Sequence, residues 1–202
     1  MNFRKEIQHI YLVGAKSLGA YGGYETFVYK LTEYHQNKEN IKYHVACKAN
    51  GDGCMDESKF EGVTKINDHE FEFHNAHCFK IDVPQIGSAQ AIYYDVAALK
   101  ACCEHIKKNH IPHPIVYIMA CRIGPFAGHF YREIHKLGGT VFLNPDGECE
   151  IIRGCHNRDK GTAENERLRD PKFIFSYPKN ERLIFLCGRN AAQEEISTMR
   201  VG

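Results

Sequence analysis

The chain has 202 residues, of which 43% are hydrophobic and 25% are charged, so it is long enough for one domain with a substantial core and a short appendage. Its 26 Lys and Arg residues against 25 Asp and Glu residues give a formal net charge of +1. This balance lacks the basic excess that is typical of nucleic-acid-binding modules, and we expect no nucleic-acid partner.

The N-terminal stretch "MNFRKEIQHI" is charged and has no apolar segment of the kind found in signal peptides. No stretch approaches the roughly 18 to 20 apolar residues that a transmembrane helix needs. We therefore expect a cytoplasmic protein. Its nine cysteines form no CxxC pair, which favours reduced thiols over disulfides. The thiols that we expect in the core are Cys47, Cys78, Cys102, Cys103 and Cys121.

The first half of the chain predicts a strand–helix–strand unit followed by a hairpin. "HIYLVG" (9–14) is a short apolar run typical of a buried strand, and apolar residues then recur at helical spacing to about residue 36. "IKYHVAC" (41–47) is the second strand, residues 48–68 read as a loop, and 71–83 alternate as in a hairpin that turns at "HNAH". The residues expected on the inner face of the first helix are Tyr24, Phe27, Val28, Leu31 and Tyr34.

The second half continues the alternation. A helix over about 90–109 is expected to start at a Ser88 cap. "IVYIMAC" (115–121) predicts a central parallel strand, a helix reaches residue 137, and 138–147 form a strand with its exit turn. This order predicts an α/β fold, a Rossmann-like three-layer sandwich with a mainly parallel sheet, over residues 1–147. The inner face of the helix over 90–109 is expected to hold Ile92, Val96, Leu99, Cys103 and Ile106.

Residues 148–202 have a different character. The stretch 148–172 is highly charged and has no sustained apolar period, while "FIFSYP" and "RLIFLC" are candidates for two short strands. We therefore predict a domain boundary after residue 147 and an irregular C-terminal tail over 148–202.

Candidate site residues gather in the loop after the first strand, because ligands of open α/β sheets bind outside the carboxyl ends of the strands. Glycines there allow close approach to the backbone, and the free N–H groups of the following helix can bind an anion or a hydroxyl. Glu25 could accept a hydrogen bond from a sugar hydroxyl, or its carboxylate could simply interact favourably with the positive end of the helix dipole. The spacing is not GxGxxG, so a dinucleotide site is weakly supported. The residues proposed for substrate binding in this loop are Gly14, Tyr21, Gly22, Gly23 and Thr26.

Two further loops carry candidate residues at the same edge. Arg122 follows the central strand and offers a guanidinium for phosphate or carboxylate, or else pairs with Asp146 or Glu25. "NPDG" contributes Asn144 and Asp146, and this sequence either makes a simple turn or places a carboxylate that acts as a base.

The histidines raise the question of a metal. His74 with His77, His110 with His113, and Cys149, Cys155 and His156 are the nearest groupings in the sequence. Because none has an established ligand spacing, we expect no metal site, although a small metal or redox protein remains an alternative.

Five segments in consistent order resemble the N-terminal domain of bacterial rhamnosyltransferases of the GT-B, family 4-like type. They are "YLVGAKSLGAYGGYETFVYKL", "IKYHVAC", "IGSAQAIYYDVAALK", "YIMACRIGPF" and "GGTVFLNPDG". The resemblance spans about residues 8 to 147. The departures are Tyr24 in place of the usual Phe, a first loop that is one residue shorter and lacks its Pro, and the loss of His and Trp after "NPDG".

The resemblance implies transfer of L-rhamnose from dTDP-L-rhamnose to a lipid-linked saccharide at the inner face of the membrane, in capsule or cell-wall polysaccharide synthesis. It implies no metal or other cofactor, an acceptor-side role for this domain, and Asp146 or Glu25 as the catalytic carboxylate. Only 55 residues follow Gly147, too few for the second Rossmann-like domain that binds the donor. We therefore expect little or no transfer by the chain alone, and the alternative is a non-catalytic remnant that binds an acceptor or a partner.

Overall fold

The computed structural model describes residues 7–19, 22–120, 123, 126–144 and 184–185, and these contain one eight-stranded sheet. The strand order is β3-β4-β5-β2-β1-β6-β7-β8. All neighbours from β5 to β8 pair in parallel, whereas β3–β4 and β4–β5 are antiparallel. The predicted α/β fold with a mainly parallel sheet is confirmed. The strands are β1 (Gln8–Val13), β2 (Ile41–Lys48), β3 (Thr64–Lys65), β4 (Glu70–Phe73), β5 (Ala76–Ile81), β6 (Ile115–Ile118), β7 (Thr140–Leu143) and β8 (Ile184–Phe185).

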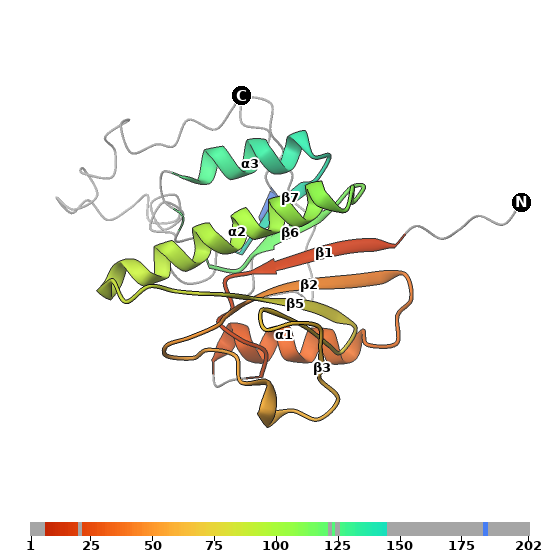
Figure 1. Ribbon diagram of the computed structural model, residues 1–202. Coiled ribbons are helices and arrows are strands. Elements are labelled where there is room, and N and C mark those ends of the chain that lie inside the picture. The colour runs from red at the N-terminus through yellow and green to blue at the C-terminus, as the bar shows by residue number, and fades with distance from the viewer. Residues whose placement is uncertain (1–6, 20–21, 121–122, 124–125, 145–183, 186–202) are drawn as a thin grey trace, which may run out of the picture.

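Helices cover both faces of the sheet, which gives three layers. Helix α1 (Gly23–Tyr34) lies on one face, and α2 (Gln90–Lys108) and α3 (Ala127–Lys136) lie side by side on the other (Figure 1). Neighbouring residues of β1 point to opposite faces, as the two-residue period of a strand requires. Tyr11 belongs to the core under α2 and α3, and Leu12 belongs to the core under α1.

The predicted hairpin over residues 71–83 is present as β4 and β5. The two residues between the strands, His74 and Asn75, have φ of 48° and 59°. Positive φ at both central positions is typical of the tight turns whose twist matches that of the flanking strands. The region expected to be a loop, 48–68, also contains the 3₁₀ turn η1 (Glu57–Lys59) and the short strand β3, which the sequence did not predict.

Some helix details differ from the expectation. Ser88 does not cap α2, because it lies inside the 3₁₀ turn η2 (Gly87–Ala89) and the position before α2 is Ala89, which makes no side-chain cap. Phe27, Tyr34 and Ile92, which were expected to face the core, are 43%, 78% and 46% exposed. Leu99, Cys103 and Ile106 are buried as expected. The other buried residues of α2 are Tyr94, Asp95, Ala98 and Cys102.

The tail contributes one described element. Ile184 and Phe185, within "RLIFLC", form β8 and pair in parallel with β7, so this predicted strand is confirmed. "FIFSYP" and the predicted boundary after residue 147 lie outside the described residues.

Four of the five thiols expected in the core, at positions 47, 78, 102 and 103, are buried and free, whereas Cys121 lies outside the described residues. Among the helices that the structure describes, none combines the length and the apolar character needed to cross a bilayer.

Candidate functional site at the carboxyl edge of the sheet

Three strands end together at the edge towards which the arrow of β1 points (Figure 1). The N–H of Met119 donates to the carbonyl of Val13 at 2.8 Å, and the N–H of Asn144 donates to that of Ile118 at 2.9 Å. The loops after β1, β6 and β7 therefore start beside one another, as expected for parallel strands. The site residues predicted from the sequence that are described here are Gly14, Gly22, Gly23, Glu25, Thr26 and Asn144, whereas Tyr21, Arg122 and Asp146 lie outside the described residues.

Two glycines of the first loop are required by the packing of the chain itself. Gly14 has φ of +112°, and a Cβ on it would lie 2.7 Å from the backbone nitrogen of Ala120 in the loop after β6. Gly19 has φ of +76°, and a Cβ there would lie within 3 Å of the rings of Phe60 and Tyr29. Gly23 has open space around it. Of these three glycines, only Gly23 leaves room for an approaching ligand.

Glu25 braces the loop from the first turn of α1. Its Oε1 accepts a hydrogen bond of 2.9 Å from the N–H of Lys16, and its Oε2 occupies the place that a Cβ on Gly22 would need. The N–H of Thr26 donates to the carbonyl of Gly22 at 3.0 Å, which starts the helix. An acidic residue here also complements the positive end of the helix dipole. The carboxylate thus has a structural role that is visible in its contacts.

Buried contacts hold the loop against the sheet. The hydroxyl of Tyr94 in α2 lies 2.5 Å from the carbonyl oxygen of Ala15 and 2.9 Å from that of Ala46. Burial raises the pKa of Tyr94 well above its usual value, so its hydroxyl stays protonated and acts as a donor. The N–H of Lys48 donates to the carbonyl of Lys16 at 2.7 Å. Contacts from α2 and β2 therefore hold the loop in place.

Large apolar side chains lie exposed around this edge, because the helices run opposite to the parallel strands and their first turns reach it. Each of these side chains is between 43 and 49% exposed, and each lies in or just before the first two turns of a helix. Exposed large apolar side chains beside a site are candidates for contact with a partner or a lipid. We call Phe27, Ile86, Ile92, Tyr93 and Phe126 the apolar rim.

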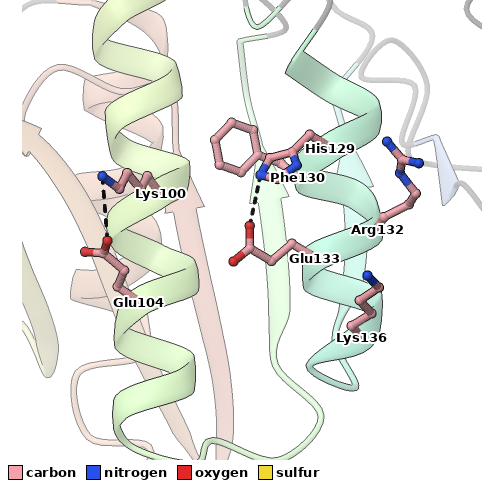
Figure 2. A pocket seen from close by; sticks show the side chains of 7 residues that line it. All are labelled: Lys100, Glu104, His129, Phe130, Arg132, Glu133 and Lys136. Atoms are coloured by element: carbon pink, nitrogen blue, oxygen red, sulfur yellow. Dashed lines mark ion pairs between the residues drawn. The ribbon is translucent and has the colours of Figure 1, made fainter.

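A polar groove lies between α2 and α3 (Figure 2). It has a volume of about 550 Å³. Its charges pair along each helix: Lys100 with Glu104 at 3.9 Å, and His129 with Glu133 at 3.3 Å. Such i, i+4 pairs are typical of a solvated helix surface. The remaining residues that line it are Phe130, Arg132 and Lys136.

One group of side chains among the described residues could hold a metal ion, and it lies at the opposite, amino edge. It consists of His44, His77 and His105. The sequence singled out His77 but coupled it with His74, and it missed the other two. The strand register brings His44 to His77, because they are direct partners on β2 and β5, and the packing of α2 on the sheet adds His105.

Comparisons with known proteins identify a family. The solved structures include a similar one, an alpha,alpha-trehalose 6-phosphate synthase from Burkholderia multivorans, with a TM-score of 0.40 and 10% identity over 73% of this chain. The match spans 35% of that enzyme, so this chain corresponds to about a third of its length. No curated protein matches the sequence. A family model described as a domain of unknown function, DUF1972, matches residues 7–158, which is more than half of the sequence, and the chain therefore belongs to this family.

Proposed function

We propose that this chain is the acceptor-side domain of a GT-B glycosyltransferase that transfers L-rhamnose from dTDP-L-rhamnose to a lipid-linked saccharide. The observation that carries the proposal is the carboxyl edge, where a braced loop and the open start of α1 adjoin the apolar rim. A lipid-linked saccharide has polar and apolar parts that match these two surfaces. The five sequence segments that resemble rhamnosyltransferases include the loops of this edge.

The polar half of the edge suits the head of such an acceptor. Gly23 and Thr26 in the first turn of α1 are exposed. The N–H of Gly23 at the helix start favours phosphate or hydroxyl oxygen, and Thr26 offers its hydroxyl. Asn144 directly follows β7 and lies beside β6. Its amide side chain is of a type that both donates and accepts hydrogen bonds. We assign Arg122 and Tyr21 to the same acceptor surface on the basis of the sequence alone.

The reaction needs a carboxylate near the acceptor. The acceptor oxygen bonds to the anomeric carbon of rhamnose, the bond to dTDP breaks, and the hydroxyl proton passes to the carboxylate. Asp146 and Glu25 are the candidates. Glu25 already accepts a hydrogen bond from the loop, which favours Asp146 as the base and leaves Glu25 to shape the site.

The proposed partners follow from this assignment. A second domain or chain binds dTDP-L-rhamnose across the carboxyl edge, and the protein works at the cytoplasmic face of the inner membrane, where the apolar rim contacts lipid. Capsule or cell-wall polysaccharide synthesis is the corresponding process.

Binding of the acceptor tests the proposal with the chain as it exists. A lipid-linked saccharide in nanodiscs is expected to bind the purified protein, whereas dTDP-L-rhamnose is not. Tyr93→Ser should weaken this binding at least fivefold. Tyr34→Ser is the matched control, because Tyr34 is an exposed tyrosine at the far end of α1. Absence of binding, or equal losses in both variants, would contradict the proposed acceptor surface.

Transfer assays test the proposed need for a separate donor-binding domain. We expect no rhamnosyl product from the purified chain with donor and acceptor alone, and product once a donor-binding domain of a related enzyme is supplied.

The hydrogen bond that Glu25 accepts from the loop favours one alternative function, a remnant that binds acceptor without catalysis. Acceptor binding without product after the donor domain is supplied would support this alternative.

A further inference from the structure

The amino edge of the sheet holds a cluster of four histidines on the face covered by α2. His9 lies near the start of β1, His44 in β2, His77 near the start of β5, and His105 in the last turn of α2. The register pairs Tyr11 with His44 and His44 with His77, so side chains of three adjacent strands point to the same place. This cluster is separate from the carboxyl edge and rests on none of the residues proposed for transfer.

Three of the imidazoles already converge. One ring nitrogen from each of His44, His77 and His105 lies within 4.8 Å of the other two. The Nδ1 atoms of His44 and His77 are 3.4 Å apart. Two nitrogens bound to one tetrahedral Zn²⁺ at about 2.0 to 2.1 Å lie about 3.3 Å apart, so this pair already has the spacing of two zinc ligands.

The other ring nitrogen of each histidine faces an outer partner. His44 Nε2 lies 2.9 Å from His9 Nδ1, and His105 Nδ1 lies 2.8 Å from the hydroxyl of Tyr11. His77 Nε2 lies 3.7 Å from Oε2 of Glu70. Metal-binding histidines characteristically engage their second nitrogen with such a group, which fixes the orientation of the ring.

We propose that His44, His77 and His105 bind one Zn²⁺ ion, with water as the fourth ligand. The ligand atoms are Nδ1 of His44 and His77 and Nε2 of His105, which is the nitrogen not engaged by Tyr11. An all-imidazole set favours zinc and its neighbours in the first transition row over Mg²⁺ and Ca²⁺, which take oxygen ligands.

The positions of the three residues allow this site to close. His44 is 4% exposed and fixed, whereas His105 is partly exposed and the side chain of His77 is 12% exposed. A small movement of the His105 ring would bring its nitrogen from within 4.8 Å to tetrahedral spacing, and the partial exposure of His105 and His77 gives the ion a path from solvent. The bound ion would tie β2 and β5 to the C-terminal end of α2.

Zinc titration of the full chain, freed of metal by chelation, tests the site. Isothermal titration calorimetry should show one zinc ion per chain, and zinc should raise the melting temperature. Cobalt(II) bound in place of zinc should give the visible absorption of a four-coordinate ion. His77→Gln and His105→Gln should each weaken zinc binding at least tenfold and abolish this absorption.

The control removes two histidines outside the cluster. His110 and His113 are exposed and have positive φ, which Asn tolerates, so His110→Asn with His113→Asn should leave zinc binding unchanged. Equal loss in this control, unchanged affinity in His77→Gln and His105→Gln, or no stoichiometric binding would each overturn the proposal. If both cluster variants fail to fold, X-ray absorption of the zinc-loaded wild type decides: three imidazole ligands support the site, and fewer overturn it.

Discussion

The two edges of the sheet are built in different ways. At the carboxyl edge, backbone approaches backbone, as where Gly14 meets Ala120, and large apolar side chains remain exposed around the loops. At the amino edge, the register of three strands brings imidazoles into mutual contact: the rings of Tyr11 and His44 stack with centroids 4.4 Å apart. The first arrangement leaves an open surface, for which we propose a large amphipathic ligand. The second brings three ring nitrogens within 4.8 Å of one another, and for these we propose a single zinc ion.

The largest expected effect comes from Gly14→Ala, which tests the backbone contact at the carboxyl edge. The new Cβ would lie 2.7 Å from Ala120 N, at a φ of +112° that side chains rarely adopt. Strain and overlap each cost about 1 to 3 kcal/mol, so we expect a loss of about 3 to 5 kcal/mol in the free energy of unfolding. Urea denaturation followed by circular dichroism measures it.

Gly23→Ala is the matched control for this prediction. Gly23 begins α1 with open space where the Cβ would go, and Ala is the better helix former, so stability should rise by up to about 1 kcal/mol. Similar losses in both variants would show that the contact with Ala120 is not what requires glycine at position 14.

The amino edge is expected to make the metal-free protein sensitive to acid. Burial, reinforced by the neighbouring imidazoles and by Lys42, lowers the pKa of His44 to about 2, and burial lowers that of His105 to about 4. Burial also lowers the pKa values of His9 and His77. The charged groups that bear on the cluster besides Lys42 are Glu70, Glu72 and Lys108.

These lowered histidine pKa values make the folded protein less stable as the pH falls. A histidine whose folded pKa lies below the unfolded value of 6.5 stabilises the fold fully above pH 6.5, and this stability is lost as the pH falls below it. His44 alone accounts for about 1.4 kcal/mol per pH unit, or about 2 kcal/mol between pH 6.5 and 5. Thermal unfolding at pH 7 and pH 5, with a chelator present, measures the loss. His44→Phe should flatten this dependence, and an unchanged slope in that variant would contradict the assignment.

The fold was largely predictable because apolar periodicity is local. The run before Gly14 and the alternation around "HNAH" are enough to predict β1 and the hairpin. The two-residue strand β3 was missed because both its residues are exposed, which leaves no apolar pattern. Ile92 carries helical periodicity but lies in the first turn of α2, where the side chain is left exposed.

The sites were predictable only in part, for a related reason. The sequence identifies the carboxyl edge as the site, since the loops after parallel strands lie at that edge. The glycines in the first loop indicate that another group approaches its backbone closely. It cannot say that Gly14 meets Ala120, a residue in a loop after another strand. The sequence singled out only His77 of the histidine triad, because the three members come from two strands and a helix that only the register and the helix packing bring together.

A smaller effect is expected from the brace at Glu25. Glu25→Ala removes the acceptor for the N–H of Lys16 and should cost about 1 kcal/mol, the typical net contribution of one hydrogen bond. Glu25→Gln keeps a carbonyl oxygen in the same place and should cost less than half of that. Because Gln cannot take a proton as a base, a completed enzyme carrying Glu25→Gln separates the two roles. Retained transfer with retained stability would leave Asp146 as the base.

The smallest effect is expected in the groove between α2 and α3, which belongs to neither edge. Lys100 and Glu104 are separated by 3.9 Å, and their side chains are 72% and 69% exposed. Exposed pairs at i, i+4 contribute about 0.3 to 0.5 kcal/mol and are screened by salt. A double-mutant cycle of Lys100→Ala and Glu104→Ala, measured by urea denaturation at low and high salt, should therefore give a coupling below about 0.5 kcal/mol that falls with salt. Acceptor binding should be unchanged in both variants, and a loss there would move the proposed binding surface from the apolar rim to the groove.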